Sequence, residues 1–338
     1  MPTVHFLNVG EGDCSILQHS SGRVTMIDTC GGNLDAKQES QAKMVHKIFE
    51  STVSGGGDYG MRECPTNPVN YCLANGIKSI FRFILTHPDM DHMDGLDNLL
   101  TRVPVANFWK TGTRKEKPDF SEGGYKEEDW DSYAALAARK REGITVLSHL
   151  AGAQFEFANK GEPKGGGDYL SIVAPSPQLV ATANESEDCN DASYVVVYRT
   201  CGGNIVFPGD AHDGTWEHVT KHYKSLVQNC GVLIAPHHGR KSDRDYSFLD
   251  VLKPGLTLFG CAPSEHLAYS AWSYRELPYI TQNQAGNIIL EGTDEGIEVF
   301  VENITFARTQ QAFDESRTHF GCYYIGRVPA PVKQEQAA

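Results

Sequence analysis

The sequence predicts a layered α/β protein in which helices cover the faces of β-sheets. Three observations support this prediction. Short apolar strands alternate with segments of helical periodicity in both halves of the chain, several strands end in clusters of His and Asp, and 40% of the 338 residues are hydrophobic. Strands flanked by helices indicate sheets that helices cover, and a chain of this length can bury a full core.

The first half of the chain begins with β-structure. Residues 4–9, 13–18 and 23–27 are predicted to be hairpin strands, because polar and apolar residues alternate and short turns with glycine separate the runs. Apolar residues at helical spacing predict a helix over 36–49. Glycines and prolines near residues 50–75 interrupt regular structure, so we expect a surface insertion there.

The rest of the first half alternates strands and helices. We expect a buried strand over 81–85 and a helix that includes Leu96 and Leu100. A further strand is expected at 105–109, followed by an Ala-rich amphipathic helix over 129–141. The polar segment between the strand at 81–85 and the helix that includes Leu96 therefore lies on a strand-to-helix junction.

The second half repeats this pattern, and we expect one domain over 1–328. The expected strands and helices are the strands 194–198, 204–207, 232–235 and 256–259 and the helices 215–223 and 248–252. The remaining residues, 329–338, are polar and contain proline, which is typical of a flexible tail.

Charge and cysteine content restrict the class of protein. With 30 Lys and Arg against 43 Asp and Glu, the net charge is −13, the wrong sign for binding nucleic acid over a broad surface, although a local cationic or metal site is compatible with it. Nine cysteines without a Cys-x-x-Cys pair disfavour a disulfide framework and a structural zinc site. There is no signal-peptide pattern and no stretch near the roughly 18 apolar residues of a membrane span. We expect a reduced, cytoplasmic protein outside the membrane.

The segment after the strand at 81–85 contains potential metal ligands. His87, Asp89, Asp91 and His92 fall within six residues. A single Asp before a helix is commonly an N-cap, so a structural role would explain any one of the Asp residues taken alone. Four imidazole and carboxylate ligands together favour a metal site instead.

Two further clusters also follow strands. Asp210 ends the run Phe207-Pro208-Gly209-Asp210, and His237 and His238 end the run Ala235-Pro236-His237-His238-Gly239. Strand ends in α/β sheets open onto one edge, where ligands typically bind. We therefore expect the three clusters to converge on one site.

With these motifs, the chain resembles the metallo-β-lactamase superfamily, and within it the branch typified by the hydrolase domain of ComEC-type competence proteins. Residues 6–13 (Phe-Leu-Asn-Val-Gly-Glu-Gly-Asp) are similar to the N-terminal strand and glycine turn of that branch, and residues 26–32 (Met-Ile-Asp-Thr-Cys-Gly-Gly) to its Ile-Asp-Thr-Gly-Gly segment. Residues 190–193 (Asn-Asp-Ala-Ser) are similar to its Asn-Asp-x-Ser. The match extends over most of the chain.

The resemblance implies an αββα sandwich, with two mixed β-sheets packed face to face, helices outside, and a dinuclear metal site at one edge. The metal ligands that it implies are His87 and Asp89 for one ion, Asp91, His92 and His237 for the other, and Asp210 as the bridge. The sequence departs from the commoner form of the superfamily in two places. Asp89 stands where His is usual, and no His precedes residues 190–193, where Asn190, Asp191 or Ser193 are candidate substitutes.

These departures affect the choice of metal. Oxygen donors favour harder ions such as Mn²⁺, and the imidazoles suit Zn²⁺ or Mn²⁺, so both ions remain candidates for the two positions. Two cations about 3.5 to 4 Å apart lower the pKa of a shared water and hold the oxygens of an in-line displacement. The resemblance thus implies attack by a metal-bound hydroxide, with Asp91, Asp210 and His237 as the residues of catalysis.

Other residues near these motifs have two readings each. Arg240 and Lys241 are candidates to meet a substrate phosphate, or they belong to a solvated loop. His266 and Tyr269 are candidates to protonate a leaving group or position substrate, or they are surface residues. The residues expected to support the ligands from outside are Asp13, Asp28, Asn190, Ser193 and His238.

From the resemblance, we expect a metal-dependent hydrolase of phosphodiester bonds that acts as a nuclease on DNA or RNA. The acidic charge keeps a second hypothesis open, a phosphodiesterase of small or cyclic nucleotides, and a third is a non-phosphate ester or lactam. A different class of function is a non-catalytic module that binds a protein partner. ComEC-type proteins carry the hydrolase domain beside a membrane channel, so without an apolar span we expect this chain to act alone or with a separate protein partner.

Overall fold

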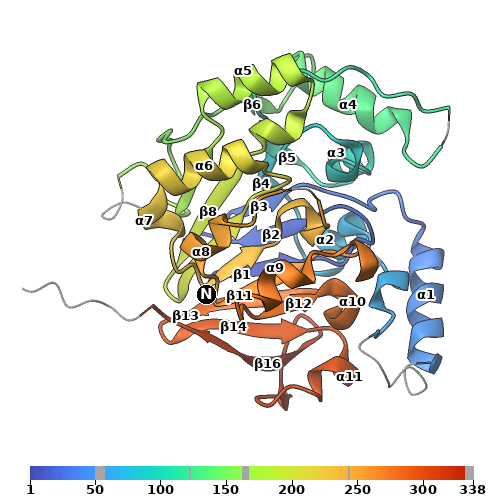
Figure 1. Cartoon of the computed structure of the whole chain (residues 1–338). Coiled ribbons are helices and arrows are strands. Elements are labelled where there is room, and N and C mark those ends of the chain that lie inside the picture. The colour runs from blue at the N-terminus through green and yellow to red at the C-terminus, as the bar shows by residue number, and fades with distance from the viewer. Residues whose placement is uncertain (50–57, 122, 162–166, 243, 263, 332–338) are drawn as a thin grey trace, which may run out of the picture.

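Two β-sheets packed face to face, with helices on their outer surfaces, form the architecture of the molecule (Figure 1). The structure is a computed structural model, and the residues that it describes are 1–49, 58–121, 123–161, 167–242, 244–262 and 264–331. The layers confirm the predicted αββα sandwich.

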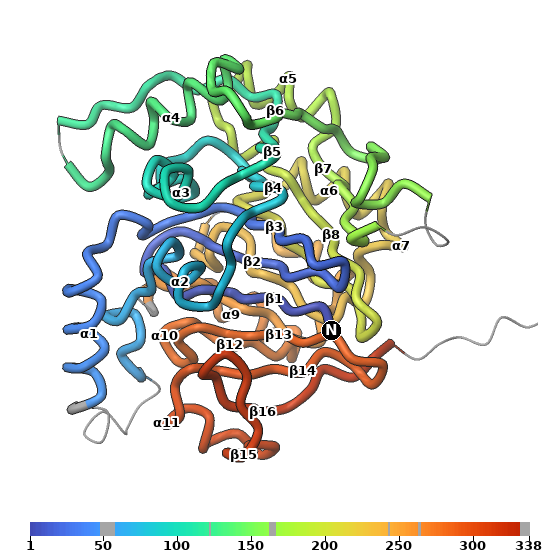
Figure 2. The backbone as a smooth tube through the Cα atoms, turned by 180° about the vertical axis from the view of Figure 1, so that it is seen from behind, coloured from blue at the N-terminus to red at the C-terminus, as the bar shows by residue number. Residues whose placement is uncertain are grey.

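Within the described residues, the larger sheet has ten strands in the order β15-β16-β14-β13-β1-β2-β3-β4-β5-β6, as Figure 2 shows from behind. The strands are β1 Thr3–Phe6, β2 Ser15–Gln18, β3 Val24–Ile27, β4 Ile80–Ile84, β5 Val105–Trp109, β6 Thr145–Leu147, β13 Ile288–Thr293, β14 Gly296–Val301, β15 Asp314–His319 and β16 Cys322–Pro329. β1 and β3 each pair antiparallel with β2, whereas β3 to β6 are parallel. The C-terminal ends of β1, β3, β4 and β5 therefore lie at one edge.

The smaller sheet has six strands in the order β12-β11-β10-β9-β8-β7 in the same part of the chain. The strands are β7 Leu170–Ala174, β8 Val195–Thr200, β9 Gly203–Phe207, β10 Val232–Ile234, β11 Leu256–Phe259 and β12 Tyr279–Thr281. β8 is antiparallel to β9, and β9 to β12 are parallel. The segment before β8 thus meets the C-terminal ends of β9 and β10 at one edge.

The helices cover both outer faces. They are α1 Ala36–Phe49, α2 Pro68–Ala74, α3 Leu96–Arg102, α4 Glu127–Ala137, α5 Pro177–Ser186, α6 Asp213–His222, α7 Lys224–Val227, α8 Phe248–Leu252, α9 Tyr269–Ser273, α10 Gln282–Ala285 and α11 Ile304–Ala307. Residues of α2, α3 and α4 share a core cluster with the larger sheet, and residues of α6 to α9 share one with the smaller sheet. None of the helices in the described ranges is both long and apolar enough to cross a membrane.

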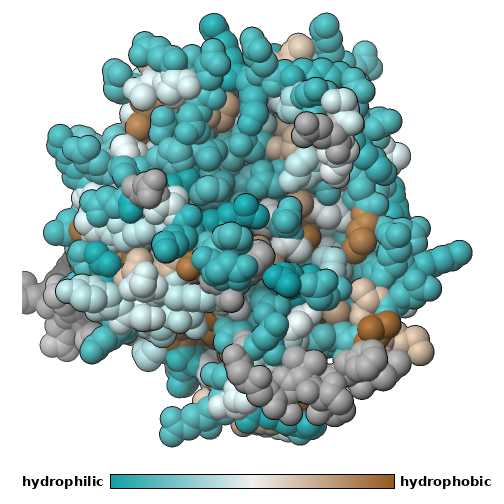
Figure 3. Space-filling model, turned by 45° about the vertical axis from the view of Figure 1, so that its right-hand side comes forward, coloured by the Kyte–Doolittle hydropathy of each residue, from teal (hydrophilic) through white to brown (hydrophobic). Residues whose placement is uncertain are grey.

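Alternating side chains of the strands separate the inner core from the outer ones. In β8, Val196 packs in the cluster between the sheets, whereas Val195 and Val197 pack in the cluster under the outer helices. In β1, Phe6 lies in the inner cluster. This period of two is the geometry of a strand that is covered on both faces. Polar residues remain at the surface, and the face in Figure 3 is mostly hydrophilic.

Several elements differ from the sequence prediction. Residues 50–57 of the expected surface insertion lie outside the described residues, but Met61 is buried and α2 buries Val69 and Cys72 in the core of the larger sheet. Met44 and Val45 of α1 are 67% and 53% exposed, although helical spacing suggested a buried face. The strands β13 to β16 were not predicted. Among them, β13 pairs with β1 and β14 pairs with β13, and such pairing between distant parts of the chain is not visible in local sequence patterns.

Gly12, in the turn between β1 and β2, allows that turn to touch the segment after β4. Its φ is +78°, and a Cβ there would lie 2.0 Å from the carbonyl oxygen of Asp91. Gly22, between β2 and β3, has a similar φ of +84° but nothing within 4 Å of a Cβ. The two glycines thus share the backbone conformation and differ in crowding.

We expect Gly12→Ala to lower the free energy of unfolding by about 2 kcal/mol more than Gly22→Ala, because only the first combines an unfavourable φ with a clash. Urea unfolding followed by circular dichroism measures both variants. Equal losses would show that the β1–β2 turn yields without cost and does not position Asp91.

Candidate metal centre

The segment after β4 carries the first cluster, and Asp28 at the end of β3 holds it in place. Asp28 accepts hydrogen bonds from the Thr86 backbone amide at 2.7 Å and from the Thr86 hydroxyl at 2.6 Å. Its second oxygen also lies 2.8 Å from Nδ1 of His92. Because Nδ1 of His92 is occupied in this way, the ring presents Nε2 to the centre of the site.

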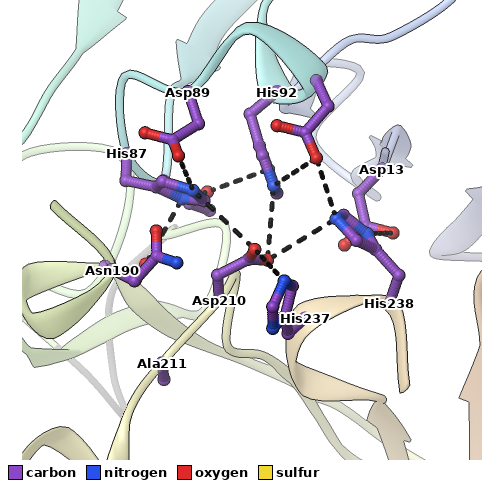
Figure 4. Close-up of polar contacts among 12 residues, drawn as sticks. Asp13, His87, Asp89, His92, Asn190, Asp210, Ala211, His237 and His238 are labelled. Carbon is purple, nitrogen blue, oxygen red and sulfur yellow. Dashed lines mark hydrogen bonds and ion pairs between the residues drawn. The ribbon is translucent and has the colours of Figure 1, made fainter. Parts of the chain in front are cut away.

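Asp210 lies where the two sheet edges meet (Figure 4). It follows β9 through Gly209, whose φ is +52° and where a Cβ would lie 2.7 Å from Cβ of Thr86. Oδ1 of Asp210 is 3.3 Å from Nε2 of His92, and Oδ2 is 3.9 Å from Nε2 of His87. The glycine therefore permits the close approach that places a buried carboxylate between the imidazoles.

The two adjacent imidazoles after β10 contact different residues of the site. His237 and His238 both have left-handed backbone conformations, with φ of 53° and 58°. Nε2 of His237 lies 3.6 Å from Oδ2 of Asp210, and its side chain is 29% exposed. Nε2 of His238 lies 3.3 Å from Asp91 and 3.8 Å from Oδ1 of Asp210. The structure thus places His238, rather than the expected His237, beside Asp91 and His92.

Asp13 supports His238 as Asp28 supports His92. Oδ1 of Asp13 lies 3.1 Å from Nδ1 of His238, and both side chains are buried. Asp13 stands in the turn between β1 and β2, so each of these two imidazoles is oriented by a carboxylate of the larger sheet. Such an outer carboxylate fixes the ring and raises the basicity of the nitrogen that faces inward.

Carboxylates also shift the pKa values of these groups. Burial lowers the pKa of His238, but Asp13 and Asp210 outweigh it and raise the pKa to about 10. Burial also lowers the pKa of His92, but Asp210, Asp28 and Asp91 outweigh it, and the pKa lies well above its usual value. Burial raises the pKa of Asp210, yet His238 and His92 hold it well below its ordinary range. Opposite charges therefore coexist in a buried site.

At the other two imidazoles the effect of burial on the pKa outweighs that of the nearby carboxylates. It lowers the pKa of His87, to which the nearby His92 adds. It lowers the pKa of His237 to about 4, and although Asp210 opposes this, Arg244 adds to it. These two rings are neutral at pH 7 and have a free lone pair for a cation.

The buried donor and acceptor atoms of the site fit a metal ion. Nε2 of His87, His92 and His238 and Oδ1 of Asp210 have no hydrogen-bond partner among the described residues. His87, His92 and Asp210 offer ligand atoms within 4.8 Å of one another, and so do Asp91, His92 and His238. Buried polar atoms without partners are costly unless an ion or water meets them. Nitrogen and carboxylate oxygen are ligands that both Zn²⁺ and Mn²⁺ accept.

The first half of the expected dinuclear site is more open. Nε2 of His87 lies 3.9 Å from Oδ2 of Asp89, whose side chain is 30% exposed, and Lys115 forms an ion pair with the other Asp89 oxygen. Ser193 places its hydroxyl 3.3 Å from Nδ1 of His87. Asn190 lies nearby in Figure 4, and its buried Oδ1 has no hydrogen-bond partner in the part of the chain that the structure describes.

The residues predicted to meet substrate lie in two segments, 240–241 and 266–269, that pair with each other. Lys241 donates its backbone amide to the carbonyl of His266 at 2.5 Å, and both side chains are exposed. Arg240 is half-buried and contributes to lowering the pKa of His237. Tyr269 packs against aromatic rings of β11 and β12. Among these four residues, as far as the structure describes the chain, Arg240 is the one whose charge shifts the pKa of a residue of the site, His237.

Sequence reasoning missed two cations near the site. Lys115 follows β5, another strand whose C-terminal end lies at this edge, and that position was the available signal. Arg244 donates to the carbonyl of Ala211 at 3.3 Å, and its charge affects His237. It stands only four residues after Arg240, so the charged run after the paired imidazoles extends further than expected. A further group of candidate ligand residues is Asp188, Asp191 and His212, and His212 directly follows Ala211 in the chain.

Comparison with known proteins identifies the fold. No family model matches the chain. The structure of Tm1679, a metal-dependent hydrolase of the β-lactamase superfamily, matches with a TM-score of 0.50 at 13% identity, over 87% of this chain and all of that one. The chain has the metallo-β-lactamase fold. Igni18, a metallo hydrolase from Ignicoccus hospitalis KIN4/I, matches with a TM-score of 0.45 at 12% identity, over 86% of this chain and 100% of that one.

The sequence is also similar to that of a curated protein. ComE operon protein 3 of Bacillus subtilis (strain 168) is 26% identical over 253 residues, which are 74% of this chain. The matched region is 27% of that protein, so this metallo-β-lactamase-fold chain spans about a quarter of its relative's length. The similarity is consistent with the predicted ComEC-type resemblance.

We expect a divalent cation to displace protons when it binds here. His92 and His238 have raised pKa values and are protonated at pH 7 in the metal-free protein, whereas an ion needs neutral rings, so about two protons should leave per ion. Affinity should accordingly rise with pH. Titration calorimetry with Mn²⁺ at pH 7, in buffers of different ionisation enthalpy, counts the protons.

The matched variant is Asp13→Asn, which removes the carboxylate beside His238. In this variant the pKa of His238 should fall toward that of a buried imidazole, and about one proton, instead of two, should leave for each ion bound. Heats that do not depend on the buffer would contradict the assignment of these two rings.

Proposed function

We propose that this protein is a metal-dependent hydrolase that cleaves phosphodiester bonds and acts as a nuclease on DNA or RNA. The observation that carries the proposal is the convergence of buried, unpartnered atoms of His92, His238 and Asp210 with Asp91 at the junction of the two sheets. The fold supports the hydrolase part, because Tm1679 shares it.

The chain's own residues prepare the site for such a reaction. Asp91, His92, His238 and Asp210 would hold one cation. His87 and His237 face the other oxygen of Asp210, and Asp89 lies beside His87, so these residues would hold a second cation. When bound, divalent cations lower the pKa of water and stabilise the charge on phosphate oxygens. Asp91, 29% exposed at its side chain, is placed to accept a proton from an attacking water. Manganese and zinc are the metals we propose.

Local positive charge supports an anionic substrate despite the net charge of −13. Arg240 and Arg244 follow the paired imidazoles, and both charges reach His237. A guanidinium matches the oxygens of a phosphate. The ComEC-type resemblance supports nucleic acid as the source of that phosphate, and the similarity to ComE operon protein 3 agrees with it.

A phosphodiesterase of small or cyclic nucleotides is the second candidate. The observation that favours it is the excess of acidic residues, 43 against 30 basic ones, which repels a long polyanion outside the immediate site. A small substrate needs only the positively charged side chains beside the centre.

The two paired imidazoles should differ in importance. With Mn²⁺ and bis(p-nitrophenyl) phosphate, His238→Ala should lower kcat by about 100-fold or more, because it removes a buried ligand, whereas His237→Ala should cost about tenfold or less. His222→Ala, exposed at the end of α6, is the matched control. Equal losses in the two site variants would refute the pairing of His238 with Asp91.

The substrate class is tested with single-stranded DNA, duplex DNA, RNA and cyclic nucleotides under the same conditions. A nuclease should bind its polymer with an affinity that falls steeply with salt, since each neutralised phosphate releases counterions. Cleavage of cyclic nucleotides alone, with weak salt dependence, would favour the second candidate. Metal binding without hydrolysis of any phosphodiester would overturn both.

A further inference from the structure

The two halves of the candidate metal centre are unequal. In one half, Asp91, His92 and His238 bring ligand atoms within 4.8 Å of one another, beside Oδ1 of Asp210. Carboxylates of the larger sheet orient both imidazoles of this half, at 2.8 Å for His92 and 3.1 Å for His238. Its ligands are therefore preorganised for a cation before one arrives.

The other half has a looser arrangement. Nε2 of His87 is 3.9 Å from both Asp89 and Asp210. Asp89 belongs to none of the groups of three or more ligand residues within 4.8 Å that the described part of the chain contains. Its outer oxygen is already in an ion pair with Lys115. A cation in this half must compete with an ammonium group for a carboxylate.

The fold holds Lys115 over this half. The preceding residue, Arg114, donates its backbone amide to Oδ1 of Asn184 in α5 at 2.7 Å, and its carbonyl oxygen accepts a hydrogen bond from the thiol of Cys189 at 3.6 Å. Cys189 begins the short 3₁₀-helix Cys189–Ala192, which also carries Asn190. The segment that lacks a histidine for this half is thus the segment that anchors the lysine.

The ammonium group of Lys115 already supplies a positive charge beside Asp89 in this half of the centre. A second divalent cation beside the ammonium would add repulsion between like charges at close range.

We propose that Lys115 supplies the positive charge of the His87–Asp89 half, so that the protein binds one divalent cation tightly and a second only weakly, in competition with this lysine. The tight ion lies among Asp91, His92, His238 and Asp210. This inference rests on the proposed function, because it assumes that the centre binds metal. It changes the expected dinuclear site into one whose second position opens when Lys115 releases Asp89.

The test is metal stoichiometry of Lys115→Met and the wild-type chain. Chelator-treated protein is titrated with Mn²⁺ by calorimetry and by electron paramagnetic resonance, which distinguishes an isolated Mn²⁺ from a spin-coupled pair. Wild type should bind one equivalent tightly and give the isolated signal. Lys115→Met should bind its second equivalent about tenfold or more tightly than wild type does, and give the coupled signal at two equivalents.

Lys117→Met is the matched control, because Lys117 lies in the same loop but pairs with Glu127 and Asp131 away from the centre. It should titrate as wild type does. Circular dichroism verifies that all the variants are folded. Two equally tight equivalents in wild type, unchanged in Lys115→Met, would overturn the role of Lys115 while leaving the proposed function in place. A wild-type protein that binds no Mn²⁺ or Zn²⁺ would overturn the proposed function itself.

Discussion

The buried carboxylate of Asp210 is the constraint on which the site depends. A carboxylate taken out of water must be matched by positive charge, and here four imidazoles surround it. Without a cation, protonated His92 and His238 provide that charge, as their raised pKa values indicate. With a cation, the same rings would become ligands. We therefore expect the proposed centre to exchange protons for metal at a carboxylate that stays ionised in both states.

The two sheets cooperate to keep this carboxylate in place. Tyr194, just before β8 of the smaller sheet, donates its backbone amide to Thr86 of the larger one at 3.0 Å, and Gly209 lets the turn after β9 touch the same threonine. The smaller sheet brings Asp210 and His238, and the larger sheet brings Asp13 and Asp28, which orient the rings. The turn that contains the strained left-handed conformations at His237 and His238 follows β10 and is held by backbone hydrogen bonds from Gly260 to His238 and from Ala268 to Gly239. Strain of this kind is typical of functional sites.

Charge around the centre is distributed unevenly, and this is compatible with the anionic substrate that we propose. Lys115 lies on the His87–Asp89 side, and Arg244 and Arg240 lie on the His237 side. The rest of the molecule carries the acidic excess. Exposed charges further apart than about 8 to 10 Å are largely screened at physiological salt, so we expect these basic residues, rather than the net charge, to govern the approach of the proposed substrate. The acidic body then opposes binding elsewhere.

The sequence by itself determined the layered α/β class, the strand-to-helix junctions and the residue types of the metal site, because these depend on local periodicity and on ligands that directly follow strands. It did not determine which of two adjacent histidines lies beside Asp91, since the direction of the His238 ring depends on Asp13, which the turn between β1 and β2 brings to it. Nor did it reveal Lys115 or the strands from 288 to 329, whose positions depend on pairing across long distances in the chain. Tertiary structure decided these points because the direction of a side chain at a sheet edge depends on what the neighbouring strands bring beside it.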